Sequence, residues 1–402
     1  PSPSADRRYD LDWIRIAAFL LLFFYHVGLF YAGWDWHVKS RHATGALDAV
    51  LMVTSPWRLP LLFLVSGAAS RFMLDRMEPR RFLEGRMARL LPPYVFAIFL
   101  IVPPQSYFEL LGREGGAPSW QGYWRLFTDG LFASPAACID RAAAAGHAVC
   151  IPVPTVNHMW FVGYIIAYSL ILWAIARAWP GVGRLGTWLE SRMTGWRVLV
   201  WPALWLAAVR LTQFPPDVTH NVLSDRYGHA LYFSLFALGF LIAKSDRIAE
   251  ALVRWRWHAL AVWVVSYVLF TGYIWAWHGR GVPAHHNVDL LARCTMGVQQ
   301  WAATAAALGF GRLYLNRDHP IRRYLTLAVF PFYIAHQTLI IAAGFFLSRQ
   351  GLSAPVEASL ILLLTFSGCW ATYEVARRVP VLDRLYGLRP QPREASRPPA
   401  AA

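Results

Sequence analysis

Charged residues are scarce in this 402-residue chain, where Asp, Glu, Lys and Arg make up 15% of the sequence against 56% hydrophobic residues. That scarcity, together with 20 Trp and a mean hydropathy of +0.36, excludes an ordinary soluble domain and indicates a polytopic membrane protein. Lysine is almost absent: only Lys39 and Lys244 occur, and the arginines that supply most of the net charge of +15 fall between apolar runs. This distribution argues against binding to nucleic acid.

The sequence also does not predict a cleavable signal peptide. The first apolar run, residues 11–31, is too long for one, contains Arg15 and has no small-residue cleavage site after it. We therefore expect this run to remain as a membrane span.

Ten apolar windows are long enough to suggest crossings, and they predict an all-α polytopic bundle of about ten transmembrane helices. The third window holds four prolines and the fifth is short, so either can be broken or partly interfacial. The ten windows are 11–31, 47–70, 90–111, 158–179, 198–213, 227–243, 258–278, 290–311, 324–347 and 355–376.

The orientation follows from the basic residues between these windows. One side holds 26 Lys and Arg residues and the other holds eight, so the positive-inside rule predicts that both termini are cytoplasmic. We expect one transmembrane domain over residues 1–388, with a long outer loop at 112–157. Residues 389–402 are predicted to form a disordered cytoplasmic tail, and no further soluble domain is expected.

Cysteine is rare, with four residues in the chain. Cys138 and Cys150 fall in the predicted outer loop, where an oxidising compartment would let them form a disulfide. Cys294 and Cys369 stand alone in apolar windows and are expected to be inert core residues. The segment HGRGVPAHHNVD is rich in histidine, but nothing in it fixes a ligand geometry, so no metal site is predicted.

The first window contains two ionisable residues, Arg15 and His26, whose burial in a membrane costs free energy. A separation of eleven residues brings both to nearly the same helix face, roughly 16 Å apart along the axis. Ionisable groups inside a membrane usually face protein or a water-filled cavity, so this stripe is a functional-site hypothesis. The alternatives are an ion pair of Arg15 with Asp12, snorkelling of Arg15, and a purely structural role for His26.

Three further polar residues lie in apolar windows. Arg58 is near the middle of the second window, where it would line a cavity or form a structural ion pair. His158, at the outer start of the fourth window, is either part of a site or an interfacial histidine beside Trp160. His336, followed by Gln337, indicates an internal site or an interhelical hydrogen bond.

Two clusters lie near the predicted membrane surfaces. Arg86 and Arg89, three residues apart on the predicted cytoplasmic side, can share one phosphate, although positive-inside bias and anionic lipid explain them equally simply. On the outer side, Trp36 and His37 of WDWHVKS suit sugar binding, while an interfacial Trp belt is the alternative.

These features together fit acyl transfer across a membrane. A coenzyme A thioester would rest its phosphates on Arg86 and Arg89, and His26 would deprotonate an acceptor hydroxyl and reprotonate the leaving thiolate. The competing class is a transporter or flippase, in which Arg58, His26 and His336 line a path without making bonds. The chain has no internal repeat of the kind many transporters carry, which disfavours that class.

The same residues resemble the membrane acyltransferase 3 family. The resemblance rests on the Arg-x10-His of Arg15 and His26, the preceding LDWIR, the FLVSG of the second window, the Arg-x-x-Arg of Arg86 and Arg89, HMWFV and FPFYIAH. YDLDWIR, HVGLFYAGWDWHVKS and HMWFV look most like its glucan biosynthesis protein C branch, which is associated with succinylating periplasmic glucans.

This resemblance implies a function and a location. The function is O-acyl transfer from cytoplasmic acyl-CoA, carrying succinyl or acetyl, to a carbohydrate outside the bacterial inner membrane. Acyl-CoA is then a substrate rather than a permanently bound cofactor. The expected partners are a periplasmic glucan or another envelope carbohydrate, membrane lipids and separate glycan-synthesis proteins. Whether His26 acts as a general base or is itself acylated is left open.

Overall fold

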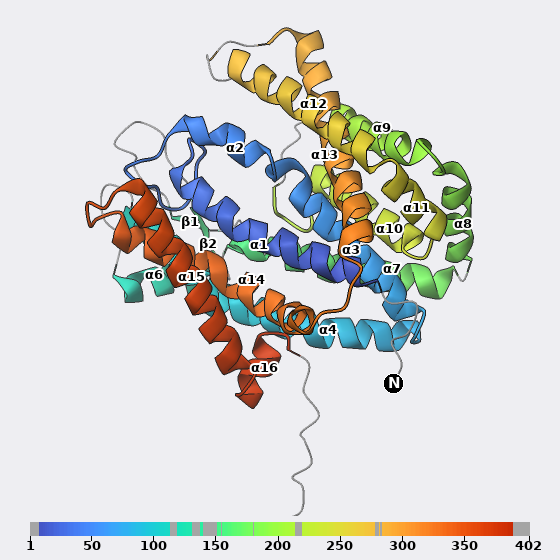
Figure 1. The fold of residues 1–402 in the computed structure, drawn as a ribbon. Helices are drawn as coiled ribbons and strands as arrows, with labels where there is room; N and C mark the ends of the chain where they lie inside the picture. The colour runs from blue at the N-terminus through green and yellow to red at the C-terminus, as the bar shows by residue number, and fades with distance from the viewer. Residues whose placement is uncertain are drawn as a thin grey trace, which may run out of the picture.

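The fold is a bundle of helices, seen in a computed structural model that describes residues 8–112, 119–130, 137–139, 151–153, 155–179, 181–213, 219–277, 281 and 284–388 (Figure 1). The α-helices are α1 (Tyr9–Tyr31), α2 (Asp48–Met52), α3 (Ser55–Leu74), α4 (Pro79–Phe96), α5 (Pro103–Gly112), α6 (Trp120–Gly130), α7 (Trp160–Ala178), α8 (Val182–Arg192), α9 (Arg197–Thr212), α10 (Arg226–Ile242), α11 (Asp246–Arg254), α12 (Arg256–Ala276), α13 (His286–Tyr314), α14 (Pro320–Leu347), α15 (Ala354–Ala376) and α16 (Pro380–Leu385). Shorter turns are η1 (Gly45–Leu47), η2 (Ala97–Ile101) and η3 (Asn157–Met159), and β1 (Ala137–Ile139) pairs antiparallel with β2 (Ile151–Val153).

Each of the ten apolar windows falls on a helical segment, so the helical membrane class is confirmed. By length and composition, seven described segments are able to cross a membrane, or eight if α10 and α11, bent by 112°, count as one span. With 16 residues, α9 is short for a crossing, and α13 carries polar residues among its alanines. Ten crossings and cytoplasmic termini therefore stay predictions. The β1–β2 pair lies within the predicted outer loop and was not anticipated by the all-α prediction.

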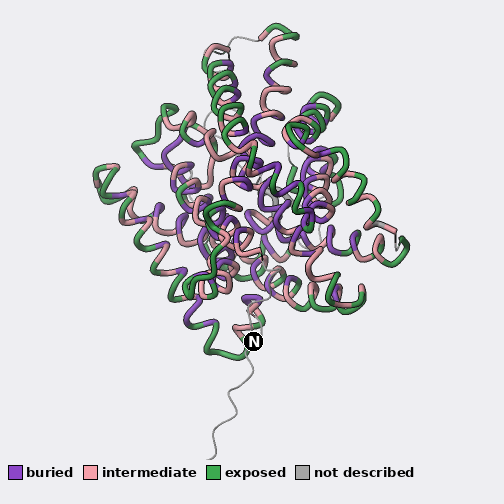
Figure 2. The backbone as a smooth tube through the Cα atoms, turned by 45° about the vertical axis from the view of Figure 1, so that its right-hand side comes forward, coloured by how far each residue is buried: buried purple, intermediate pink, exposed green. Residues whose placement is uncertain are grey.

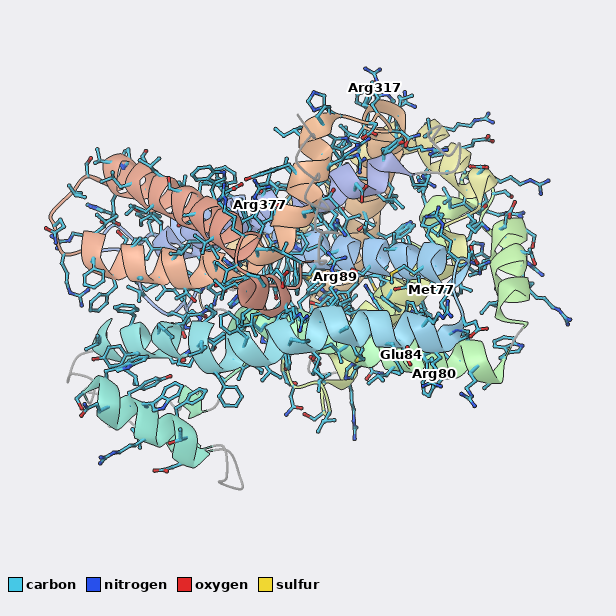
Figure 3. All side chains as sticks on the ribbon, turned by 90° about the horizontal axis from the view of Figure 1, so that it is seen from below. Met77, Arg80, Glu84, Arg89, Arg317 and Arg377 are labelled. Atoms are coloured by element: carbon cyan, nitrogen blue, oxygen red, sulfur yellow. The ribbon has the colours of Figure 1, made fainter. Side chains whose placement is uncertain are left out.

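The third window is interrupted, as its prolines predicted. Between α4 and α5 the chain forms the π-helical segment η2, where the Val102 amide donates to the Ala97 carbonyl at 2.8 Å. Pro103 and Pro104 carry no N–H group, so the preceding turn cannot close as an ordinary α-helix. The chain nevertheless continues in nearly one line across the lower face of the molecule (Figure 3).

Helices α3 and α10 pack unusually closely through glycine. A Cβ atom placed on Gly67 would lie 1.8 Å from the Phe236 carbonyl oxygen, and one placed on Gly239 would lie 2.0 Å from the Leu64 carbonyl oxygen. Each glycine thus lets the other helix's backbone approach, which is the usual use of small residues between membrane helices.

Gly67→Leu is expected to destabilise the fold by about 3 kcal/mol, because any side chain at this position overlaps the α10 backbone. Thermal unfolding of the detergent-solubilised protein would measure the effect. Gly272→Leu is the matched control, since a Cβ at Gly272 in α12 meets nothing within 4 Å. Equal unfolding midpoints for the two variants would contradict the close approach.

Helix α1 runs through the middle of the bundle, next to α3, α13 and α14 (Figure 1). Buried residues concentrate in this middle region, while the outer turns of the peripheral helices are exposed (Figure 2). Ion pairs hold the amino-terminal end of α1: Arg322 Nη1 lies 2.6 Å from Asp12, Arg322 Nη2 lies 2.7 Å from Asp318, and Arg8 pairs with Asp10 at 2.7 Å. The stripe that carries Arg15 and His26 is therefore fixed within the core.

Two sequence predictions fall outside the described part of the chain. Cys150, the side chain of Cys138, and residues 389–402 are not described, so the disulfide and the tail stay predictions. The other two cysteines, Cys294 and Cys369, are free, and Cys369 is fully buried in an apolar cluster.

Candidate active site

A cavity of about 790 Å³ opens between α1, α3, α7 and α14, and residues 219–223 close one side of it. Four of the residues singled out from the sequence line this cavity: His26, His37, Arg58 and His158. These residues are spread over more than 130 positions of the sequence, and the fold brings them together around one cavity.

His26 lines the cavity and is bonded to His336 behind it. His26 Nδ1 and His336 Nε2 are 3.0 Å apart, and the two ring planes differ by 8°. His336 Nδ1 lies 2.6 Å from the Tyr333 carbonyl oxygen. A carbonyl can only accept a hydrogen bond, so His336 Nδ1 carries the proton and His336 Nε2 is the acceptor.

The tautomer of His26 follows from that of His336. Because neutral His336 accepts at Nε2, His26 must donate from Nδ1, and His26 Nε2 keeps a free lone pair. No described residue bonds this nitrogen. His26 is 9% exposed and His336 is fully buried, so the second histidine orients the first while only the first reaches the cavity. Of the two possibilities for His336, the interhelical hydrogen bond is present, and the internal site stays a prediction.

Trp36 and His37 lie beside this pair on the segment that follows α1. The Trp36 ring centroid is 6.0 Å from that of His26. His37 Nδ1 donates to Glu109 Oε2 at 2.5 Å, and His37 Nε2 accepts from Gln337 Nε2 at 3.1 Å. His37 is therefore held from both ring nitrogens and lines the cavity in a fixed orientation.

His158 is buried rather than interfacial. It is 7% exposed, and its Nε2 donates to the Ile334 carbonyl oxygen at 3.1 Å. Its Nδ1 lies 3.3 Å from Gln105 Nε2, which also donates to Thr338 at 2.7 Å. The alternative of an interfacial histidine is wrong, because α14 and α5 cover the residue that the hydropathy window placed at a helix end.

Arg58 lines the cavity from α3 and is 2% exposed. Its guanidinium carbon lies 3.9 Å from the Tyr25 ring centroid, its Nη1 reaches Thr54 Oγ1 at 3.4 Å, and its Nε has no hydrogen-bond partner among the described residues. No described carboxylate forms an ion pair with it, so the structural ion-pair alternative finds no support. A buried cation without a counter-ion is costly and is suited to an anionic ligand group.

Arg15 lies at the other end of the stripe and is only weakly paired. Its Nη2 is 3.9 Å from Asp12, which is held at 2.6 Å by Arg322, and its buried Nε has no hydrogen-bond partner among the described residues. Arg86 donates to the hydroxyls of Ser70 and Ser169 at 3.2 and 3.3 Å. Arg15 and Arg86 are close enough for their charges to repel.

Arg89 follows Arg86 by one helical turn of α4. Its backbone carbonyl approaches Gly387, just after α16, and Figure 3 labels Arg89 on the part of α4 beside α16. Arg15 of α1 acts electrostatically on Arg86, and the prediction of a shared phosphate for Arg86 and Arg89 did not include it.

Sequence reasoning missed one residue that bonds to the cavity's lining, Gln105, and one that lines the cavity itself, His220. Gln105 connects Asn157, Gln337, Thr338 and His158, yet a glutamine near a proline-rich break carried no signal by itself. His220, on the segment before α10, also lines the cavity and fell outside every apolar window.

The fold is a helical membrane bundle, and its cavity is lined by an oriented imidazole and by an arginine that forms no ion pair with a described residue. The chain is therefore a multi-pass membrane protein with a site suited to a polar substrate. The chain belongs to the acyltransferase 3 family: the family model described as an acyltransferase domain matches residues 8–374. It is similar to the glucans biosynthesis protein C of Escherichia coli strain K12 and to that of Escherichia coli O1:K1 / APEC. Each is 23% identical over 396 residues, covering 96% of both chains. No solved structure matches the chain. The protein is therefore a membrane acyltransferase.

Proposed function

We propose that this protein transfers an acyl group, succinyl or acetyl, from cytoplasmic acyl-CoA to a hydroxyl of a periplasmic or other cell-envelope glycan. The observation that carries the proposal is the free Nε2 lone pair of His26 in the cavity, oriented by His336 and the Tyr333 carbonyl. A neutral imidazole with one nitrogen fixed by a partner is the usual form of a general base.

The reaction uses His26 twice. Its Nε2 takes the proton of the acceptor hydroxyl as the oxygen attacks the thioester carbonyl carbon, so the new C–O bond forms while the C–S bond breaks. The imidazolium then gives the proton to the leaving thiolate, which restores the neutral base. The bond from His26 Nδ1 to His336 remains in place throughout and stabilises the transient positive charge.

The donor site is proposed at the Arg15 end of α1. Arg15 and Arg86 are two cations in proximity, with the hydroxyls of Ser70 and Ser169 between helices and Arg89 one turn away. Phosphate oxygens or the pyrophosphate of coenzyme A would relieve their repulsion, and guanidinium groups suit such anions. The roughly 16 Å from Arg15 to His26 along α1 would then be spanned by the pantetheine arm.

The proposed acceptor is based on the proteins that are similar to this chain, and the proposed location on the distribution of basic residues. Proteins named glucans biosynthesis protein C are similar to nearly the whole chain, which supports a glucan as acceptor. With the basic residues on the inner side, His26 lies toward the outer face of a bacterial inner membrane, where such a glycan would be reached. Separate glycan-synthesis proteins would supply the acceptor.

The test is reconstitution in liposomes with labelled succinyl-CoA or acetyl-CoA and purified periplasmic glucan. The proposal expects label in the glycan and free coenzyme A in equal amounts. Movement of the glycan without acylation would instead support the transporter or flippase reading. Label that stays on the protein after incubation with acyl-CoA alone would exclude a mechanism in which His26 acts only as a base.

Arg58 provides a prediction on the acyl group. If the donor is succinyl-CoA, Arg58 is the cavity cation available for its free carboxylate, so Arg58→Gln is expected to lower kcat/KM for succinyl-CoA by about 100-fold, because a charge-assisted bond is lost. Acetyl-CoA lacks that carboxylate and is expected to lose less than about tenfold. Initial rates with the two donors measure the difference.

A matched control is Arg210→Gln. Arg210 is also buried, but it bonds to Gln300 Oε1 at 3.1 Å and does not line the cavity. It should leave the ratio between the donors unchanged. Equal losses with both donors in Arg58→Gln would show that Arg58 does not recognise a carboxylate.

A further inference from the structure

One wall of the cavity has an unusual backbone. Among the described residues, the only non-glycine residues with a left-handed φ are Asn157 at 38° and His220 at 59°, and both line this cavity. Non-glycine residues adopt this region rarely, and such strain clusters at binding and catalytic sites. The two lie on separate segments, one before α7 and one before α10, that meet at the same wall.

The wall carries polar groups without charge. None of its lining residues is Lys, Arg, Asp or Glu; besides three apolar residues they are Thr155, Asn157, His158, Trp160, Thr219, His220 and Asn221. The cationic groups of the proposed donor site belong to other helices. A neutral, hydroxylated ligand fits this wall better than a phosphate or a thioester carrier does.

His220 lines the cavity beside Trp160. Its imidazole lies against the Trp160 indole, with ring centroids 4.6 Å apart and planes 36° apart, and no described residue bonds either nitrogen. Neighbouring atoms crowd the ring, although solvent reaches it through the cavity, and this partial burial lowers the pKa of His220, with Asp225 opposing the shift. A neutral imidazole offers one donor and one acceptor, which matches a sugar hydroxyl.

Hydrogen bonds to α7 and α10 hold the segment that contains His220. Asp225, 1% exposed, accepts from Tyr164 OH at 2.5 Å and from the Gly228 amide at 2.7 Å, where it caps α10. His229 Nε2 donates to the Val222 carbonyl oxygen at 2.9 Å, and its Nδ1 accepts from Tyr168 OH at 3.0 Å. The wall is therefore held in place before any ligand binds, which reduces the entropy lost on binding.

We propose that this wall is the acceptor subsite, and that His220 binds a hydroxyl of the acceptor's sugar ring beside Trp160. The inference rests on the proposed function, because it places the glycan of that reaction. It assigns the acceptor to the 155–160 and 219–223 segments, which line the same cavity as His26, so that a hydroxyl of the same sugar unit would reach His26 Nε2.

The test separates hydrogen bonding from packing. His220→Phe keeps a ring against Trp160 and removes both nitrogens, so KM for glucan is expected to rise about tenfold, while KM for acyl-CoA stays within twofold. His220→Asn keeps a donor and an acceptor and tolerates a left-handed φ, so it should retain most of the affinity. His286→Ala, an exposed histidine at the start of α13 outside the cavity, is the control.

The outcomes distinguish this inference from the proposed function. Wild-type protein that transfers acyl groups, with an unchanged glucan KM in His220→Phe, overturns the subsite alone. A rise in the acyl-CoA KM, or a fall in kcat alone, also overturns it. Wild-type protein that transfers nothing overturns the proposed function. Glucan binding without acyl-CoA, measured by titration calorimetry on wild type and His220→Phe, then decides the subsite separately, and equal affinities refute it.

Discussion

Replacing His26 with alanine is expected to lower kcat for acyl transfer by about 1,000-fold without unfolding the protein. His26 Nε2 is the one imidazole nitrogen in the described cavity that both keeps its lone pair and is oriented through its other nitrogen by a histidine. General base catalysis contributes about 100- to 10,000-fold, and this variant loses all of it. KM for acyl-CoA should change little, because the proposed donor contacts lie at the Arg15 end of α1. Single-turnover transfer of labelled acyl groups to glucan measures the effect.

His42→Ala is the matched control for that variant. His26 lies on α1 and His42 on the segment that follows it, but His42 bonds through Nε2 to the Leu352 carbonyl oxygen at 2.9 Å and does not line the cavity. It should retain nearly full activity. A folded His26→Ala protein that transfers acyl groups at the wild-type rate would remove His26 from the mechanism.

Much of the helical framework could be predicted from local sequence. Apolar windows and prolines depend on neighbouring residues, so they located the helices and the break between α4 and α5. The stripe of Arg15 and His26 was also predictable, because both residues lie on one helix and its periodicity fixes their faces.

The contacts that give the site its chemistry were not predictable in this way. His26 and His336 are 310 residues apart, and nothing local indicates that α1 and α14 lie side by side. For the same reason His158, which begins a helix in the sequence, was placed at a surface that α5 and α14 in fact cover. The partners of a buried polar residue depend on helix packing, which hydropathy does not determine.

Arg15 shows how a local prediction is altered by a distant residue. The spacing of three residues offered an intrahelical pair with Asp12 as one alternative. That pair is present but long, at 3.9 Å, because Arg322 of α14 binds Asp12 more closely, at 2.6 Å. The same ion pair that anchors α1 therefore leaves a cation available near Arg86, which links the stability of the bundle to the proposed donor site.

The orientation of His26 leads to the second large effect. His336→Phe keeps an aromatic ring, which packs against Phe23 at a centroid distance of 5.0 Å in the wild type, but it offers no acceptor for His26 Nδ1. His26 would then be free to adopt the other tautomer, with a proton on Nε2, and kcat is expected to fall by about 100-fold. KM for both substrates should stay nearly constant, because His336 is fully buried and does not line the cavity.

His336→Gln separates orientation from packing. Its side-chain oxygen can accept from His26 Nδ1, so this variant should recover most of the activity that His336→Phe loses, although its side chain is not aromatic and packs less well beside Phe23. A purely structural role for His336 would give the opposite order, with the phenylalanine variant more active than the glutamine variant. The ranking of the two kcat values thus decides whether the bond between the two histidines serves the chemistry or only the fold.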